Sequence, residues 1–134
     1  MVTQARPISN IHGDFTADNV LMDSDSVVVL DICAEKRNAV DLDISSFLNS
    51  LVMLRLTHPV PWNAIDDMSE AFLHGYFDTD DFSPTTIRFL QCIGLADIAL
   101  EIVKRRRSKI MHFWVERNVS AALKKIIAQL RRSQ

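Results

Sequence analysis

The stretch HGDFTADNVL, residues 12–21, decides how the rest of this 134-residue chain is read. Its first residues are mostly polar, so we interpret the segment as a loop. This loop presents Asp14 and Asn19, five residues apart. After a turn of Asp and Ser residues, a β-branched run at residues 27–30 ends at Asp31. The pattern therefore predicts a loop followed by a β-hairpin, which brings these three polar side chains together.

These three side chains carry hard oxygen donors. Mg²⁺ prefers such donors, takes one or two carboxylates from the protein, and completes its shell with water and phosphate oxygens. Phosphoryl transfer needs that arrangement, because charge on the phosphates must be neutralised and a carboxylate must orient the acceptor hydroxyl. The catalytic loop of protein kinases has the pattern H-R-D-x-x-x-x-N. His12, Asp14 and Asn19 have the same spacing, with Gly13 in place of Arg.

The stretch resembles the signature H-G-D-x-x-x-x-N-x-L of the aminoglycoside phosphotransferase and choline kinase family. A hairpin follows in that family and ends in an apolar-Asp pair, which residues 30–31 match. Residues 41–42 resemble the family's Asp-Leu-Ala at the start of the next helix, and residues 71–76 resemble its Phe-x-x-Gly-Tyr helix end. By motif, the resemblance covers roughly residues 8–76.

The resemblance implies a role for each residue of this site. Asp14 would orient and deprotonate the acceptor hydroxyl, Asn19 would coordinate Mg²⁺ through its side-chain oxygen, and Asp31 would hold the metal ions that bridge the phosphates. His12 would brace the loop by hydrogen bonds rather than transfer protons. Asp41 would cap its helix or brace the loop. The implied reaction transfers the γ-phosphate of ATP to a small-molecule hydroxyl.

Apolar residues take up helical spacing after residue 41. Prolines within residues 57–61 break the first helix, and Ser83-Pro84 suits the start of a later one. The pattern predicts four helices, at about residues 41–56, 63–76, 84–106 and 110–130.

The expected fold class is α+β, mostly α, and it resembles the C-terminal lobe of a protein kinase-like fold. Residues 8–40 would form the catalytic loop, hairpin and metal-binding segment, and residues 41–134 a helical subdomain of the same single lobe, 1–134. Only eleven residues precede His12, so we expect the N-terminal nucleotide-binding lobe to be absent. The chain would then be a fragment, a truncated product or one partner of a split protein, with poor ATP affinity alone.

Charge is unevenly distributed along the chain. The first 81 residues carry 14 acidic and 4 basic side chains, whereas the remainder carries 3 acidic and 11 basic ones. The basic run at residues 105–109 reads as a solvated helix end, because nucleic-acid binding favours interleaved aromatic residues and a wider basic face. Two interpretations stay open for five acidic residues: they form an acidic wall that binds a cationic acceptor, or they are solvated loop and cap residues. The five are Asp66, Asp67, Asp78, Asp80 and Asp81.

Two cysteines, Cys33 and Cys92, lack the spacing of a disulfide framework, so free thiols in a reducing cytosol are expected. The longest uncharged run is too short for a membrane span, which needs about 20 residues. A cytoplasmic small-molecule kinase is the first hypothesis. The second is an inactive, pseudokinase-like binding or assembly module that joins an N-terminal lobe partner or itself. The third and weakest is a nucleic-acid-binding helical pair at residues 84–134.

The acceptor stays open at this point. An aminoglycoside, choline, another amino alcohol, a sugar and a protein hydroxyl are all compatible with the motif.

Overall fold

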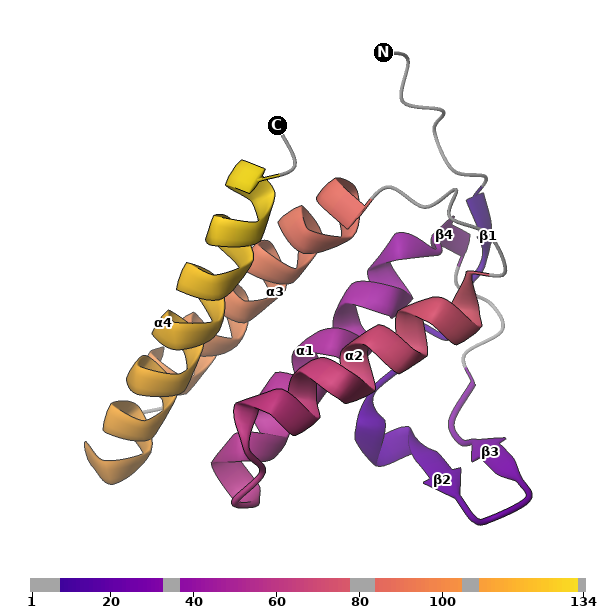
Figure 1. Ribbon diagram of the computed structural model, residues 1–134, viewed down its shortest axis with the longest axis horizontal. Coiled ribbons are helices and arrows are strands. Elements are labelled where there is room, and N and C mark those ends of the chain that lie inside the picture. Colours follow the sequence, from indigo (N-terminus) through magenta and orange to yellow (C-terminus); the bar gives the residue numbers. More distant parts are fainter. Residues whose placement is uncertain (1–7, 33–36, 78–83, 105–108, 133–134) are drawn as a thin grey trace.

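The computed structural model describes residues 8–32, 37–77, 84–104 and 109–132 (Figure 1). In these ranges, two small antiparallel sheets and four helices form a mostly helical α+β fold, as the sequence predicts. The elements are, in order, β1 (Ile8–Asn10), the 3-10 turn η1 (Ala17–Asn19), β2 (Val20–Met22), β3 (Val27–Val29), β4 (Arg37–Ala39), α1 (Asp41–Thr57), α2 (Trp62–Tyr76), α3 (Pro84–Lys104) and α4 (Lys109–Arg132).

The predicted hairpin is present as β2 and β3. The strands pair antiparallel, with Val20 opposite Val29. The Asp23 N–H donates to the Ser26 carbonyl at 2.9 Å and closes the turn, which is the behaviour expected of a turn rich in Asp and Ser. Figure 1 shows the hairpin extending away from the helices.

A second sheet, formed by β1 and β4, was not predicted from the sequence. Ile8 lies opposite Ala39, and Asn10 lies opposite Arg37. Each strand has only three residues and is mostly exposed, so neither carries the alternating pattern that marks a half-buried strand. This pairing places residues 8–10 beside residues 37–39, close to the start of α1.

Helices α1, α2 and α4 agree with their predicted bounds to within two residues, and α3 begins at Pro84 as predicted. Helix α1 ends at Thr57, and α2 begins at Trp62, directly after Pro61. The proposed cap at Ser83 and the expected end of the third helix at residue 106 lie outside the described residues.

Helix α1 is the centre of the helical part and contacts each of the other three helices. In Figure 1, α3 and α4 lie side by side on one flank of α1. Because α1 meets neighbours on several sides, it is apolar over much of its circumference instead of having one apolar stripe. The buried core has members from all four helices, among them Ile44, Leu48, Ile65, Ile87, Leu95, Val115 and Val119.

Arg55 joins three of the helices near the end of α1. Its guanidinium lies 4.4 Å from the ring centroid of Trp62 on α2. Its Nε donates to the side-chain oxygen of Asn118 on α4 at 3.3 Å, and another guanidinium nitrogen donates to the Val60 carbonyl. The planar guanidinium can stack and donate in two directions at once, which a lysine ammonium cannot do.

Cys92 on α3 has a free thiol, and partial burial raises the pKa of that thiol. Cys33 lies outside the described residues. Within the described ranges, no helix combines the length and the apolar character needed to cross a membrane.

Alanine substitutions at two leucines of α3 test which side of this helix lies in the core. Leu95 is 0% exposed and Leu100 is 51% exposed. Leu95→Ala is expected to lower the free energy of unfolding by about 2–5 kcal/mol, because it leaves a cavity. Leu100→Ala should change it by only about 0.5 kcal/mol. Urea denaturation followed by circular dichroism measures both; equal losses would contradict the assignment of Leu95 to the core.

Candidate functional site

The side chain of Asn19 faces Asp14. Its amide nitrogen donates to the Asp14 backbone carbonyl at 2.9 Å and lies 3.4 Å from the Asp14 carboxylate oxygen Oδ2. Both partners are acceptors, which fixes the orientation of the amide group. The amide oxygen of Asn19, which the resemblance assigns to Mg²⁺, is therefore the atom not engaged by Asp14.

The backbone of Leu30 connects this loop to the hairpin. Its N–H donates to the Asn19 carbonyl at 2.8 Å, and its carbonyl lies 2.7 Å from Nε2 of His12. We refer to these two hydrogen bonds as the Leu30 clamp. Because Leu30 directly precedes Asp31, the clamp fixes the start of Asp31 beside Asn19.

The clamp also fixes the tautomer of His12. A carbonyl oxygen can only accept, so Nε2 carries the hydrogen and Nδ1 has the lone pair. Nδ1 lies 3.4 Å from the Asp14 N–H, which can donate to it. Both ring nitrogens face backbone groups and the residue is buried, so the ring acts as a brace between the loop and the hairpin.

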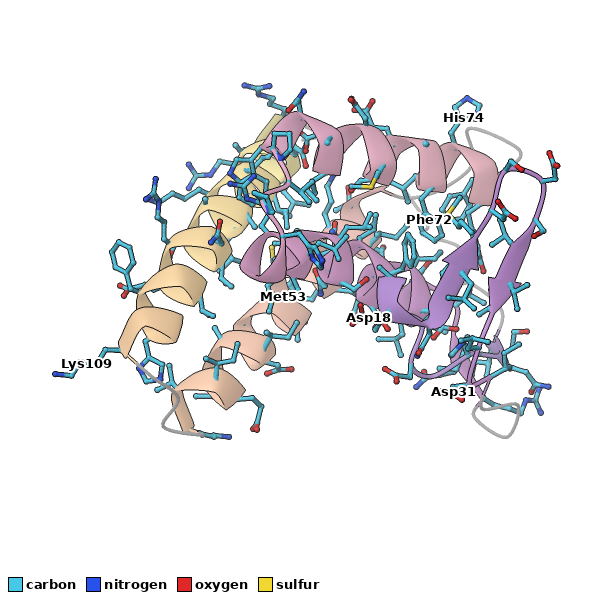
Figure 2. All side chains as sticks on the ribbon, turned by 90° about the horizontal axis from the view of Figure 1, so that it is seen from below. Asp18, Asp31, Met53, Phe72, His74 and Lys109 are labelled. Carbon is cyan, nitrogen blue, oxygen red and sulfur yellow. The ribbon has the colours of Figure 1, made fainter. Side chains whose placement is uncertain are left out.

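Asp31 has an unusual backbone conformation. Its φ is 55°, and it is the one non-glycine residue with positive φ in the part of the chain that the structure describes. This left-handed conformation costs roughly 1–2 kcal/mol for an L-residue, although Asp tolerates it better than most. Such strain gathers at functional sites, where the surroundings enforce it. Figure 2 shows Asp31 at the sheet end of the molecule, far from Lys109 at the other end.

Asp43, which sequence reasoning missed, braces the loop from α1. Its two carboxylate oxygens accept the His12 N–H at 2.6 Å and the Gly13 N–H at 2.9 Å. Gly13 has a φ of 82°, a conformation that glycine adopts without strain. The sequence assigned capping or bracing to Asp41. Val40 is the residue at the helix cap, Asp41 is buried in the first helical turn, and Asp43 makes the contacts to these two loop amides. A bracing role for Asp41 stays a prediction.

The rest of the loop is attached to α1 and α2. The Ala17 N–H donates to the Ser50 hydroxyl at 2.8 Å, and that hydroxyl donates to the Phe47 carbonyl at 2.6 Å. The ring of Phe15 stacks on Phe47 with 5.0 Å between centroids, and lies 6.0 Å from Phe72. Figure 2 shows Phe72 on the helix that covers this region. The signature loop is thus held by hydrogen bonds and by an aromatic cluster.

A cavity of about 690 Å³ lies beside Asp14, between the loop, α1 and α3. It gives an acceptor molecule room next to the proposed base. Two of its lining residues, Asp18 and Met53, are labelled in Figure 2. Among the described residues, its lining includes no Lys or Arg and consists of Gly13, Asp14, Thr16, Asp18, Ser46, Asn49, Ser50, Met53, Leu54, His58, Gly94, Ile98 and Ile102.

The donor set fits a phosphate-bound magnesium ion better than a metal held by protein alone. No group of three or more His, Cys, Asp or Glu side chains within the described ranges could hold a metal ion. Asn19 and Asp31 offer one amide oxygen and one carboxylate, on segments that the Leu30 clamp joins. Mg²⁺ is commonly bound by one or two such groups together with substrate phosphates and water.

The proposed acidic wall lies only partly within the described residues. Asp66 on α2 forms an ion pair with Lys125 on α4 and lines a different cavity from the one beside Asp14. Asp78, Asp80 and Asp81 lie outside the described residues, as does most of the basic run at 105–109.

No protein-family model matches the chain, and no curated protein or solved structure is significantly similar to it. The kinase-like resemblance therefore depends on the motif, and the roles it implies remain predictions.

The bracing by Asp43 can be tested with Asp43→Asn. The amide group would keep one acceptor oxygen but turn an N–H toward a loop N–H, so the loop should lose about 1.5–3 kcal/mol of stabilisation. We expect faster hydrogen exchange at the amides of His12 and Gly13, measured by NMR. Asp67→Asn on the exposed surface of α2 is the matched control. Unchanged exchange at both loop amides in Asp43→Asn would contradict the bracing role.

Proposed function

We propose that this chain carries the catalytic loop and metal-binding segment of an ATP-dependent phosphotransferase, which transfers the γ-phosphate to a small-molecule hydroxyl. The Leu30 clamp is the observation that supports this proposal best. It joins the loop bearing Asp14 and Asn19 to the strand end bearing Asp31. Three donors from separate positions in the sequence are thereby kept on one short unit, as phosphoryl transfer requires.

In the proposed reaction, the carboxylate of Asp14 orients the acceptor hydroxyl and takes its proton. General-base assistance of this kind typically contributes about 10²–10⁴-fold to the rate. Asn19 keeps Asp14 in position through its amide nitrogen. The amide oxygen of Asn19 and the carboxylate of Asp31 would hold Mg²⁺, which supplies charge neutralisation on the phosphates when bound. Because the transition state of phosphoryl transfer is loose, most of the catalysis comes from such positioning and neutralisation.

The metal assignment can be tested with Mn²⁺ and ATP. Mn²⁺ replaces Mg²⁺ at oxygen-rich sites and broadens NMR signals nearby, so weak nucleotide binding remains measurable. We expect the side-chain amide signals of Asn19 to broaden in the wild-type chain. Asp31→Asn should remove this broadening because it removes the anionic ligand. Asp14→Asn should retain it, because that carboxylate serves the hydroxyl.

Asp23→Asn is the matched control, since it removes one carboxylate from the hairpin turn. The phosphotransferase proposal would be refuted if the Asn19 side-chain amide signals broadened equally in the Asp31→Asn and Asp23→Asn variants.

A second candidate function is a binding or assembly module without catalytic activity. The exposed apolar surface of the hairpin favours it, because an isolated two-stranded sheet is marginal in water and such surfaces often mark interaction sites. The exposed residues on and beside the hairpin are Leu21, Met22, Val27, Val28 and Ile32.

This alternative predicts self-association through the hairpin. Wild-type chain should elute at a larger apparent mass as its concentration rises, in size-exclusion chromatography with light scattering. The double variant Met22→Ser, Val27→Ser should stay monomeric over the same range. A monomeric wild-type chain at every concentration would argue against self-assembly.

A further inference from the structure

We propose that the cavity beside Asp14 binds the phosphate acceptor, and that this acceptor is a neutral or cationic alcohol with an apolar body. Sugars, aminoglycosides and anionic alcohols are then poor acceptors. This inference rests on the proposed function and deepens it, because the motif alone leaves the acceptor open.

The residues of α1 that line the cavity change from polar to apolar along the helix. Its lining residues on α1 fall at positions 46, 49, 50, 53 and 54, which share one face of a helix. The first three are Ser, Asn and Ser, and the last two are Met and Leu. At 1.5 Å of rise per residue, this face runs for roughly 12 Å. The polar end therefore gives way to an apolar end within the length of a small ring-bearing molecule.

Helix α3 extends the apolar end. It contributes Gly94, Ile98 and Ile102 to the lining, each one helical turn from the last. A hydroxyl placed against Ile98 or Ile102 would lose its hydrogen bonds to water without gaining others, which is costly. An apolar group placed there gains from leaving water. This end of the cavity therefore selects against polyhydroxylated acceptors.

Charge restricts the other end. The carboxylates of Asp14 and Asp18 line the cavity near the loop, and none of the described residues that line it is Lys or Arg. An anionic acceptor would meet like charge beside these carboxylates, whereas an ammonium group would be attracted. A neutral or cationic head group is therefore favoured beside the proposed base.

A buried amide gives a second, independent indication of a ligand. Asn49 is 4% exposed, and its side-chain oxygen accepts no hydrogen bond from the residues that the structure describes. An unsatisfied buried acceptor costs about 1–3 kcal/mol. Asn49 is among the residues that line the cavity, and its amide nitrogen faces α3, because a Cβ at Gly94 would lie 2.4 Å from Nδ2. A rotation of this amide toward the cavity would let its buried oxygen accept from a ligand hydroxyl or ammonium.

Four small probes separate these features in NMR titrations of the ¹⁵N-labelled full chain. The probe 2-amino-1-phenylethanol has a cationic head and an apolar ring. Ethanolamine lacks the ring, glucose is a neutral polyol, and 3-phenyllactate has the ring with an anionic head. We expect 2-amino-1-phenylethanol to bind at least about tenfold tighter than each of the others, with shifts at the Gly94 and Ile98 amides.

Paired variants on α3 locate the binding. Ile98→Asp should weaken the binding of 2-amino-1-phenylethanol at least about tenfold, because it places charge in the apolar end. Ile93→Asp, at an exposed position of the same helix outside the lining, should leave it unchanged. If Ile98→Asp does not fold, Ile98→Ser replaces it, and the probe ranking on the wild-type chain needs no variant.

Three results would overturn the inference: similar affinity for all four probes, no binding at millimolar concentration, or shifts confined to other elements. Concentration-dependent shifts at Gly94 and Ile98 without any probe would also overturn it, because a second copy would then fill the cavity. These titrations contain neither nucleotide nor metal. If the probes do not bind but Mn²⁺ broadens the Asn19 signals as expected, only the proposed acceptor class is contradicted. If the probe binds as expected but the Mn²⁺ broadening does not depend on Asp31, the phosphotransferase proposal is contradicted.

Discussion

Two hydrogen bonds to the backbone of Leu30 hold the candidate site together. One comes from the His12 ring and the other goes to the Asn19 carbonyl. Each contributes only modestly to the stability of the fold, because a typical hydrogen bond contributes about 0.5–1.5 kcal/mol net. Their importance is geometric, because they are the contacts that set the strand end with Asp31 against the loop. The remaining contacts of the loop position this unit on the helices.

Helix α1 gives the loop its rigidity. Asp43, in the first turn of α1, holds two loop amides, and Ser50, about two turns later, holds a third. Another face of the same helix contributes Ile44 and Leu48 to the buried core. The precision of the loop therefore derives from core packing, as expected for functional groups that are supported by rigid elements. Within the described residues, the helices contact the β2–β3 hairpin less than they contact the loop before it.

Local patterns predicted much of the fold, whereas the roles of the site residues that the motif names stay predictions. The hairpin and the four helices follow from turn chemistry and apolar spacing. The β1–β4 sheet could not be predicted in this way, because three-residue strands pair across nearly thirty intervening positions without a local signal. The same limit applies to the crossing of Asn49 and Gly94, which depends on how α3 packs on α1.

The bracing by Asp43 has a signal in the sequence that Asp41 shares only in part. Both acids precede an apolar residue, but residues 43–45, Asp-Ile-Ser, also have a small third residue, like the Asp-Leu-Ala pattern. Attention to that third position would have favoured Asp43. Which carboxylate faces the loop is still decided by where the helix begins, and the cap at Val40 sets that start.

The left-handed backbone of Asp31 has a consequence for how such a chain can diverge. Asn and Gly accept this conformation at least as readily as Asp does, whereas β-branched residues do not. A descendant with Asn or Gly at this position would keep the course of its backbone and lose the carboxylate that we propose as a metal ligand. One substitution at Asp31 would thus remove the carboxylate and keep the backbone conformation. An inactive descendant would therefore be expected to retain the fold of an active ancestor.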